Sequence, residues 1–274
     1  MKKILIPTDF SKNSCQVIDY TMKLFKNETC AFYFLNTYLY DSNGLSAIEM
    51  LQAEDDWFEK PKEESLQHLG ELLERFTGDK GNIKHSYHVI SEYASLVEGL
   101  EKQVKEIGID LIVLKGEIIV SKQVKVIIDK VRACPILIVP SAASIYKKLN
   151  LTITSTFKQV LRTIEVDAFL NILSNTNCDI NILVLEKEET ATAEVKNNLK
   201  QFVSHLEKFP NSAVQVEYMK ASRSLKDYAI THLNSIMCIT DKKPGLLRKI
   251  GLTQSKAISV LEKISKNPVL AIHQ

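Results

Sequence analysis

Six residues of the first half of the sequence have side chains or backbone properties suited to binding a polar ligand. They are Asp9, Thr37, Lys115, Gly116, Ser121 and Lys122. The first four lie at or just beyond the expected ends of buried strands, and the last two lie in the segment that leads from the fourth strand to the next helix. A carboxylate at such a turn can accept hydrogen bonds from a ligand. It can equally cap the following helix or order the turn, so a structural role for Asp9 remains open beside a ligand role.

The second half offers a different chemistry, based on positive charge. Lys242, Lys243, Arg248 and Lys249 lie close together, and Thr253 follows them. Such a segment could hold a small anion electrostatically. A cluster of charges in a loop is more often simply solvated, which is the competing interpretation.

The residue pattern gives little support to catalysis. The six histidines show no metal-ligand spacing, and none stands beside an obvious nucleophile. The sequence contains no G-x-S-x-G elbow, no Walker loop and no G-x-G-x-x-G segment. Because no base, nucleophile or metal-carboxylate pair is visible, an enzyme such as a weak ATP hydrolase is the least favoured class.

An internal repeat indicates the elements that must position these residues. Lys3 to Ser11 reads KILIPTDFS, and Asn150 to Lys158 reads NLTITSTFK about 147 residues later. The two halves also end alike, with CPILIVP from Cys134 and NPVLAIH from Asn267. The repeat predicts two similar domains in one chain. We expect residues 1–141 to form the first domain, 142–149 the linker and 150–274 the second domain.

Hydrophobic periodicity predicts strands alternating with helices in both halves. In the first half we expect strands at 4–7, 30–36, 84–90, 111–114 and 136–139, and helices at 14–25, 55–76, 95–107 and 124–131. In the second half we expect strands at 151–153, 180–185, 214–218, 236–239 and 269–272, and helices at 160–173, 194–206, 225–233 and 258–264. This order predicts parallel sheets covered by helices on both faces, with residues 41–62 as an insertion of the first half.

Composition excludes several other classes. A net charge of +2 gives no concentrated basic face for nucleic acid, and no apolar run is long enough to span a membrane. The five cysteines are odd in number and form no CxxC pair, so they indicate neither a disulfide framework nor a zinc site. Most of them are expected to be small core residues, and the chain is expected in the cytoplasm.

Four segments together resemble the universal stress protein family. They are PTDFS after the first strand, LNT at the end of the second, IDLIVLKG on the fourth and CPILIVP on the fifth. The duplicated layout resembles the tandem members of that family. The resemblance implies two five-stranded, parallel, doubly wound domains of the adenine-nucleotide α-hydrolase-like kind, joined as a pseudo-dimer. A ligand would then lie beyond the carboxyl ends of the strands.

Members of this family that bind ATP resemble one another in an acidic residue after the first strand and a glycine-rich phosphate loop after the fourth. Here the acidic residue would be Asp9, and Thr37 would lie near the adenine. The first two loop glycines align with Lys115 and Ile118, where a β-branched residue cannot easily take a positive φ. In the second half Thr156 replaces Asp9, and the three glycines fall on Ile239, Lys242 and Leu252, with only the closing Thr253 in agreement.

The resemblance therefore predicts a non-catalytic stress-response protein with degenerate ATP loops in both halves, acting through protein contacts or a weakly bound ligand. No cofactor is expected, and the protein partners are unknown. The alternative is an ATP- or AMP-binding stress regulator that uses the pocket around Asp9, with a phosphate contact rebuilt from Lys115, Ser121 and Lys122. Any ligand should then occupy the first half rather than the second.

The resemblance also implies how the halves assemble. Family members commonly pair two domains through their fifth strands, and both copies keep an apolar run that begins with proline, Pro135–Val139 and Pro268–Ile272. We expect these runs to pair antiparallel within one chain, and a further homodimer is compatible with this arrangement.

Overall fold

The computed structural model describes residues 1–40, 55–78, 84–116, 121–146, 148–210, 212–219, 224–243, 264 and 266–274. The first half forms five strands: β1 (Lys2–Pro7), β2 (Cys30–Tyr38), β3 (Ser86–Tyr93), β4 (Leu111–Gly116) and β5 (Ile136–Pro140). Its helices are α1 (Lys12–Leu24), α3 (Asp55–Thr77), α4 (Leu96–Gln103), the π-helical turn η1 (Val104–Gly108) and α5 (Lys122–Lys130).

The second half repeats this order of strands. They are β6 (Leu149–Ser155), β7 (Cys178–Val184), β8 (Val214–Tyr218), β9 (Ser235–Asp241) and β10 (Val269–His273). Its described helices are α6 (Ile164–Ile172), the short 3₁₀ helix η2 (Glu188–Thr190), α7 (Ala193–Leu206) and α8 (Leu225–Thr231). The predicted helix 258–264 and the predicted insertion 41–62 both lie largely outside the described residues.

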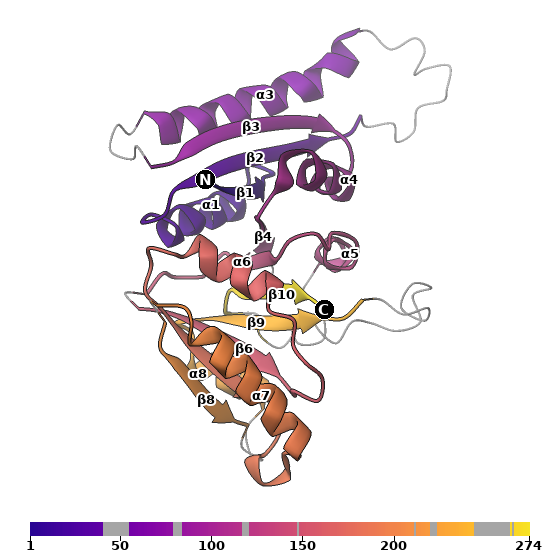
Figure 1. The fold of residues 1–274 in the computed structure, drawn as a ribbon. Helices are drawn as coiled ribbons and strands as arrows, with labels where there is room; N and C mark the ends of the chain where they lie inside the picture. The colour runs from indigo at the N-terminus through magenta and orange to yellow at the C-terminus, as the bar shows by residue number, and fades with distance from the viewer. Residues whose placement is uncertain are drawn as a thin grey trace.

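All ten strands belong to one sheet, in the order β3-β2-β1-β4-β5-β10-β9-β6-β7-β8. Figure 1 shows this sheet running from β3 and α3 at the top of the view to β8 and α7 at the bottom. Each half is parallel and has its first strand in the middle, which is the order of a doubly wound sheet. The predicted fold class is confirmed.

The halves join where β5 and β10 pair antiparallel, as predicted for the fifth strands. Leu137 lies opposite Leu270, with Ile136 opposite Ala271 and Ile138 opposite Val269. This symmetric register places a pseudo-twofold axis at the Leu137–Leu270 pair, so the two residues are equivalents in the two copies.

The apolar core lies on both faces of the sheet and crosses from one half to the other. One cluster joins residues of α1, α3, α6 and α7 to the strands, and it includes Val17, Leu69, Phe169 and Phe202. The other lies under α4, α5 and α8. Because buried apolar area is the main stabilising contribution to folding, the two halves share one core rather than touching through their surfaces.

One predicted helix begins later than its pattern indicates. The apolar spacing predicts a helix from Val160, but α6 begins at Ile164. Residues 160–163 instead have no regular secondary structure. There the Arg162 N–H donates to the Gln274 side chain, and Gln274 donates back to the Arg162 carbonyl oxygen. The tertiary contact with the end of the described chain therefore outweighs the local helical pattern.

Candidate functional site

The turn between β1 and α1 carries an unusual backbone conformation that the second half repeats. Phe10 has φ 57° and Phe157 has φ 53°, which are the positive-φ residues other than glycine among those described. In each copy the phenylalanine N–H donates to a hydroxyl two residues earlier, on Thr8 (3.1 Å) and on Ser155 (3.2 Å). A bulky side chain rarely adopts this region, so the repeated hydroxyl is the local cause of the turn.

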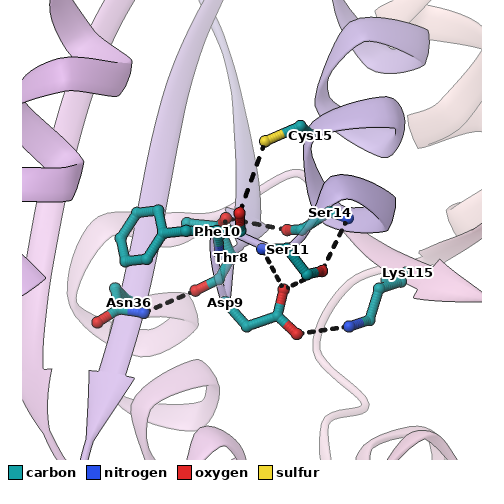
Figure 2. Close-up of polar contacts among 8 residues, drawn as sticks. All are labelled: Thr8, Asp9, Phe10, Ser11, Ser14, Cys15, Asn36 and Lys115. Atoms are coloured by element: carbon teal, nitrogen blue, oxygen red, sulfur yellow. Dashed lines mark hydrogen bonds and ion pairs between the residues drawn. The ribbon is translucent and has the colours of Figure 1, made fainter.

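Hydrogen bonds from neighbouring elements hold the first of these turns in place, as Figure 2 shows. The Thr8 hydroxyl accepts from Ser14 in α1 (2.9 Å), and the Thr8 carbonyl oxygen accepts from the Asn36 side chain in β2 (2.8 Å). The Ser11 hydroxyl accepts from the Ser14 N–H and caps α1. The turn is therefore tied to the helix that follows it and to the neighbouring strand.

Asp9 projects from this turn toward Lys115 at the end of β4 (Figure 2). The Lys115 Nζ donates to Asp9 Oδ2 at 2.5 Å, and the Ser11 hydroxyl and N–H donate to Asp9 Oδ1 at 2.6 and 3.2 Å. The Asp9 side chain is 56% exposed and that of Lys115 is 27% exposed. Asp9 thus orders the turn, as its structural interpretation predicts, while Ser11 supplies the helix cap.

These contacts control the charge of Asp9. Partial burial raises the pKa of its carboxyl group, but hydrogen bonds from Lys115 and Ser11 and the positive charge of Lys115 outweigh burial. The pKa of Asp9 therefore lies below its usual value, which keeps the carboxylate ionised and paired.

Gly116 and Thr37 have packing roles that need no ligand. A Cβ at Gly116 would lie 3.0 Å from Ile138 and 3.2 Å from the backbone of Val139 and Pro140, so the close approach of β4 to β5 requires glycine here. Thr37 lies near the end of β2, where its methyl group faces Gly99 of α4 at 2.8 Å from an added Cβ. Both glycines make room for neighbours within the protein.

Ser121 is the N-cap of α5, and Lys122 is its first residue. The Ser121 hydroxyl accepts from the Val124 N–H at 3.2 Å and caps the helix, and Lys122 is exposed. Of the six candidates in the first half, the structure brings Asp9 and Lys115 into direct contact. Thr253 and the basic residues Arg248 and Lys249 lie outside the described residues.

Strand register corrects one alignment in the second half. Gly116 lies opposite Pro140, and Asp241 lies opposite His273, so Asp241 is the equivalent of Gly116. The equivalent of Lys115 is accordingly Thr240, not Ile239 as the alignment without gaps predicts. The apolar runs Leu111–Leu114 and Ile236–Ile239 are equivalent in the sheet, so the alignment without gaps is displaced by one residue at the end of the fourth strand.

Asp241 makes a contact that sequence reasoning missed. Its side chain is 1% exposed, and it accepts from the guanidinium of Arg132, in the segment between α5 and β5, at 2.5 Å. A second Arg132 nitrogen donates to the Asp241 carbonyl oxygen at 3.0 Å. The two residues are 109 positions apart in the sequence and come from different halves, so no local pattern could indicate the pair.

A pocket of about 330 Å³ opens beside this ion pair, where the halves meet. Arg132, Arg162, Glu165, Lys243 and His273 contribute to its wall. The buried His273 ring holds Glu165 at 3.1 Å through Nδ1, and its Nε2 lies 3.3 Å from the Ile128 carbonyl oxygen of the first half. His273 and Glu165 in the pocket wall therefore already have hydrogen-bond partners within the protein.

The described residues contain no group of three or more histidine, cysteine, aspartate or glutamate side chains arranged to hold a metal ion. None of the helices in the described ranges has the length and hydropathy needed to cross a bilayer.

Comparisons with known proteins agree with this geometry. Residues 1–116 match the sequence model of the universal stress protein family. A universal stress protein from Archaeoglobus fulgidus is similar in structure over 99% of this chain and 98% of its own, with a TM-score of 0.65 and 15% identity. A protein of unknown function from Pseudomonas aeruginosa is similar over 100% of this chain and 92% of its own, with a TM-score of 0.61 and 11% identity. No curated protein sequence matches the chain.

Proposed function

Since residues 1–116 match the sequence model of the universal stress protein family, and the second half repeats the same fold, we propose that this chain is a non-catalytic stress-response protein. It acts in the cytoplasm through protein contacts or a weakly bound ligand, and it does not depend on ATP. Any small ligand that it takes occupies the first half, where Asp9 can anchor a neutral polar group.

The observation that carries this proposal is the ion pair between Lys115 and Asp9. Lys115 lies at the position of the first glycine of the phosphate loop. Its ammonium group donates to the Asp9 carboxylate, which is the group that would hold the adenosine. A ligand that used Asp9 would first have to displace this charged partner. The Ser121 hydroxyl accepts from the Val124 N–H as the cap of α5, so this helix N–H already has a partner within the protein.

Calorimetry with ATP and Mg²⁺ tests the proposal. We expect a dissociation constant weaker than about 1 mM, which corresponds to roughly −4 kcal/mol. Micromolar affinity in the wild-type chain would refute the proposal. Lys23→Ala, which removes one exposed charge from the last turn of α1, is the matched control, because Lys23 is not among the candidate site residues.

The exposure of Asp9 supports a second candidate, a nucleotide-binding regulator that uses the same pocket. With more than half of its side chain exposed, the carboxylate can be reached if Lys115 turns away toward a phosphate group. In that case Lys115→Ala would weaken AMP and ATP binding, because it removes the phosphate contact. If the ion pair blocks the site instead, Lys115→Ala would leave binding unchanged or strengthen it, so the sign of the change separates the two candidates.

A further inference from the structure

Buried polar contacts cross the junction between the halves, on either side of the β5–β10 pair. The Glu28 carboxylate, in the turn after α1, is 1% exposed although it belongs to a charged residue. It accepts from the Thr176 hydroxyl at 2.6 Å, from the Asn175 N–H at 3.0 Å and from the Asn175 side chain at 3.0 Å. All three donors belong to the turn after α6 in the second half.

Glu28 and Thr176 occupy the same position in the two copies. The helices α1 and α6 are capped by Phe25 and Leu173, and the next strands begin at Cys30 and Cys178, so both turns have the same length. The Glu28 N–H donates to the Phe25 carbonyl oxygen at 2.9 Å, and the Thr176 N–H donates to the Leu173 carbonyl oxygen at 3.0 Å. Since equivalent residues touch each other, this contact lies at the pseudo-twofold axis.

The second contact is the ion pair of Arg132 with Asp241. The symmetry-equivalent position in the first half cannot form such a pair, because it has no acidic residue. The equivalent of Asp241 in the first half is Gly116, as the register of β4 with β5 and of β9 with β10 establishes. Glycine has no side chain to receive a guanidinium. The first half therefore supplies the cation of this pair, and the second half supplies the buried anion.

We propose that these contacts make the junction selective, so that a first half pairs with a second half and not with another copy of itself. A pair of first halves would bring Glu28 against Glu28 at the axis, where Thr176 now donates. It would also place Gly116 opposite each Arg132 in the position of Asp241. A pair of second halves would bury Asp241 twice without Arg132, and would lack the carboxylate that Asn175 and Thr176 bind.

The physical basis is the cost of an uncompensated charge away from water. Two carboxylates within hydrogen-bonding distance cannot both remain ionised, and a buried carboxylate that loses a cationic partner is destabilised. Both like-with-like pairings carry such a penalty, whereas the pairing within the chain satisfies each group. Specificity of this kind comes from the rejected partners as much as from the accepted one.

The selectivity of the junction can be measured by folding the full chain first and then cutting the linker between the two halves. A protease site is inserted after Ser144, in the exposed segment between β5 and β6. The chain folds as a whole, and the protease then cuts the connection between the halves. Cleaved ¹⁵N-labelled and unlabelled proteins are mixed, and urea is added and removed until pairs of mixed label appear. Native mass spectrometry then counts pairs of first with second, first with first, and second with second halves.

We expect the unlike pairs to exceed a statistical mixture by roughly tenfold or more, which corresponds to about 1.4 kcal/mol. A statistical mixture of pairs would overturn the proposal, and so would halves that remain single. In a Glu28→Thr chain we expect pairs of first halves to increase, because the facing carboxylates are gone.

Two further variants test the axis contact itself. Thr176→Glu should deplete the unlike pairs, because it places two carboxylates at the axis. The exchanged chain Glu28→Thr with Thr176→Glu should recover them, since one carboxylate and one hydroxyl again face each other. Glu101→Thr, on the exposed face of α4, is the matched control and should leave the distribution unchanged. Failure of the exchange to recover unlike pairs would show that the axis contact does not select them.

Discussion

Phe10 and Phe157, 147 residues apart, hold the same left-handed backbone conformation in equivalent turns. Each receives its conformation from a hydroxyl two residues earlier, although the intervening residue has changed from Asp9 to Thr156. The second copy of the turn therefore keeps this conformation without an acidic residue. This relationship favours a structural requirement for the turn that is independent of any ligand bound to Asp9.

The two phenylalanines allow a matched comparison of stability. Phe157 is 1% exposed and packs on Phe202, with ring centroids 5.6 Å apart, whereas Phe10 is only partly buried. We expect Phe157→Ala to lower the free energy of unfolding by roughly 3–5 kcal/mol, as for other fully buried phenylalanines. Phe10→Ala should cost less, because less apolar surface is lost. Urea denaturation measures both, and an equal or larger loss for Phe10→Ala would contradict the burial argument.

The pKa of Asp9 predicts a pH dependence with a definite sign. Because the folded-state pKa lies below the unfolded value, the ionised carboxylate contributes stability above the unfolded pKa. That contribution is lost as pH falls through the folded-state pKa. The difference in unfolding free energy between wild type and Asp9→Asn should therefore be present at pH 7 and disappear in acid. Since Asp9 is more than half exposed, we expect the difference to stay below about 1 kcal/mol. A difference that grows on acidification would contradict this sign.

The ion pair between Arg132 and Asp241 should contribute through coupling rather than through either residue alone. Asp241→Ala leaves a largely buried guanidinium without its carboxylate, and we expect a loss of roughly 3–5 kcal/mol in unfolding free energy. The double variant Arg132→Met with Asp241→Ala should recover part of that loss, because the guanidinium that lost its carboxylate is then also removed. A double-mutant cycle in urea measures the coupling, and simple additivity of the two losses would show that the pair is not coupled.

Thiol reactivity should distinguish one cysteine from the other four. Cys30, Cys134, Cys178 and Cys238 are buried, and burial raises the pKa of Cys30, Cys134 and Cys178 to about 12 and raises that of Cys238 as well. A thiolate is the reactive form, so these four should resist a thiol reagent at pH 8 until the protein unfolds. Cys15, which is partly exposed, should account for any native labelling, and Cys15→Ser should abolish it. Rapid labelling of a second site would place one of the four outside the core.

Local patterns were sufficient to predict the strands and the repeat, whereas the pairing of the fifth strands was predicted from the family resemblance. An apolar run such as Leu111–Leu114 directly predicts a buried strand. Equivalent runs in the two halves predict the same order of strands in both. The pair of Lys115 with Asp9 could be placed at one end of the sheet, but not recognised as a contact, because it depends on side chains 106 positions apart. Nothing in the sequence indicates that Glu28 is buried or that it contacts the second half. An isolated glutamate in a polar turn is normally exposed, and its burial follows only from the approach of the second half.

The joining of the two sheets also changes how much unpaired backbone the protein exposes. Two separate sheets of five strands would have four edge strands, whereas the single sheet of ten has two, β3 and β8. α3 packs on β3 and β2, and β8 is only five residues long. A short edge strand is a usual protection against strand addition by other chains. Duplication within one chain has thus doubled the number of folded domains while leaving no more open edges than one domain would have alone.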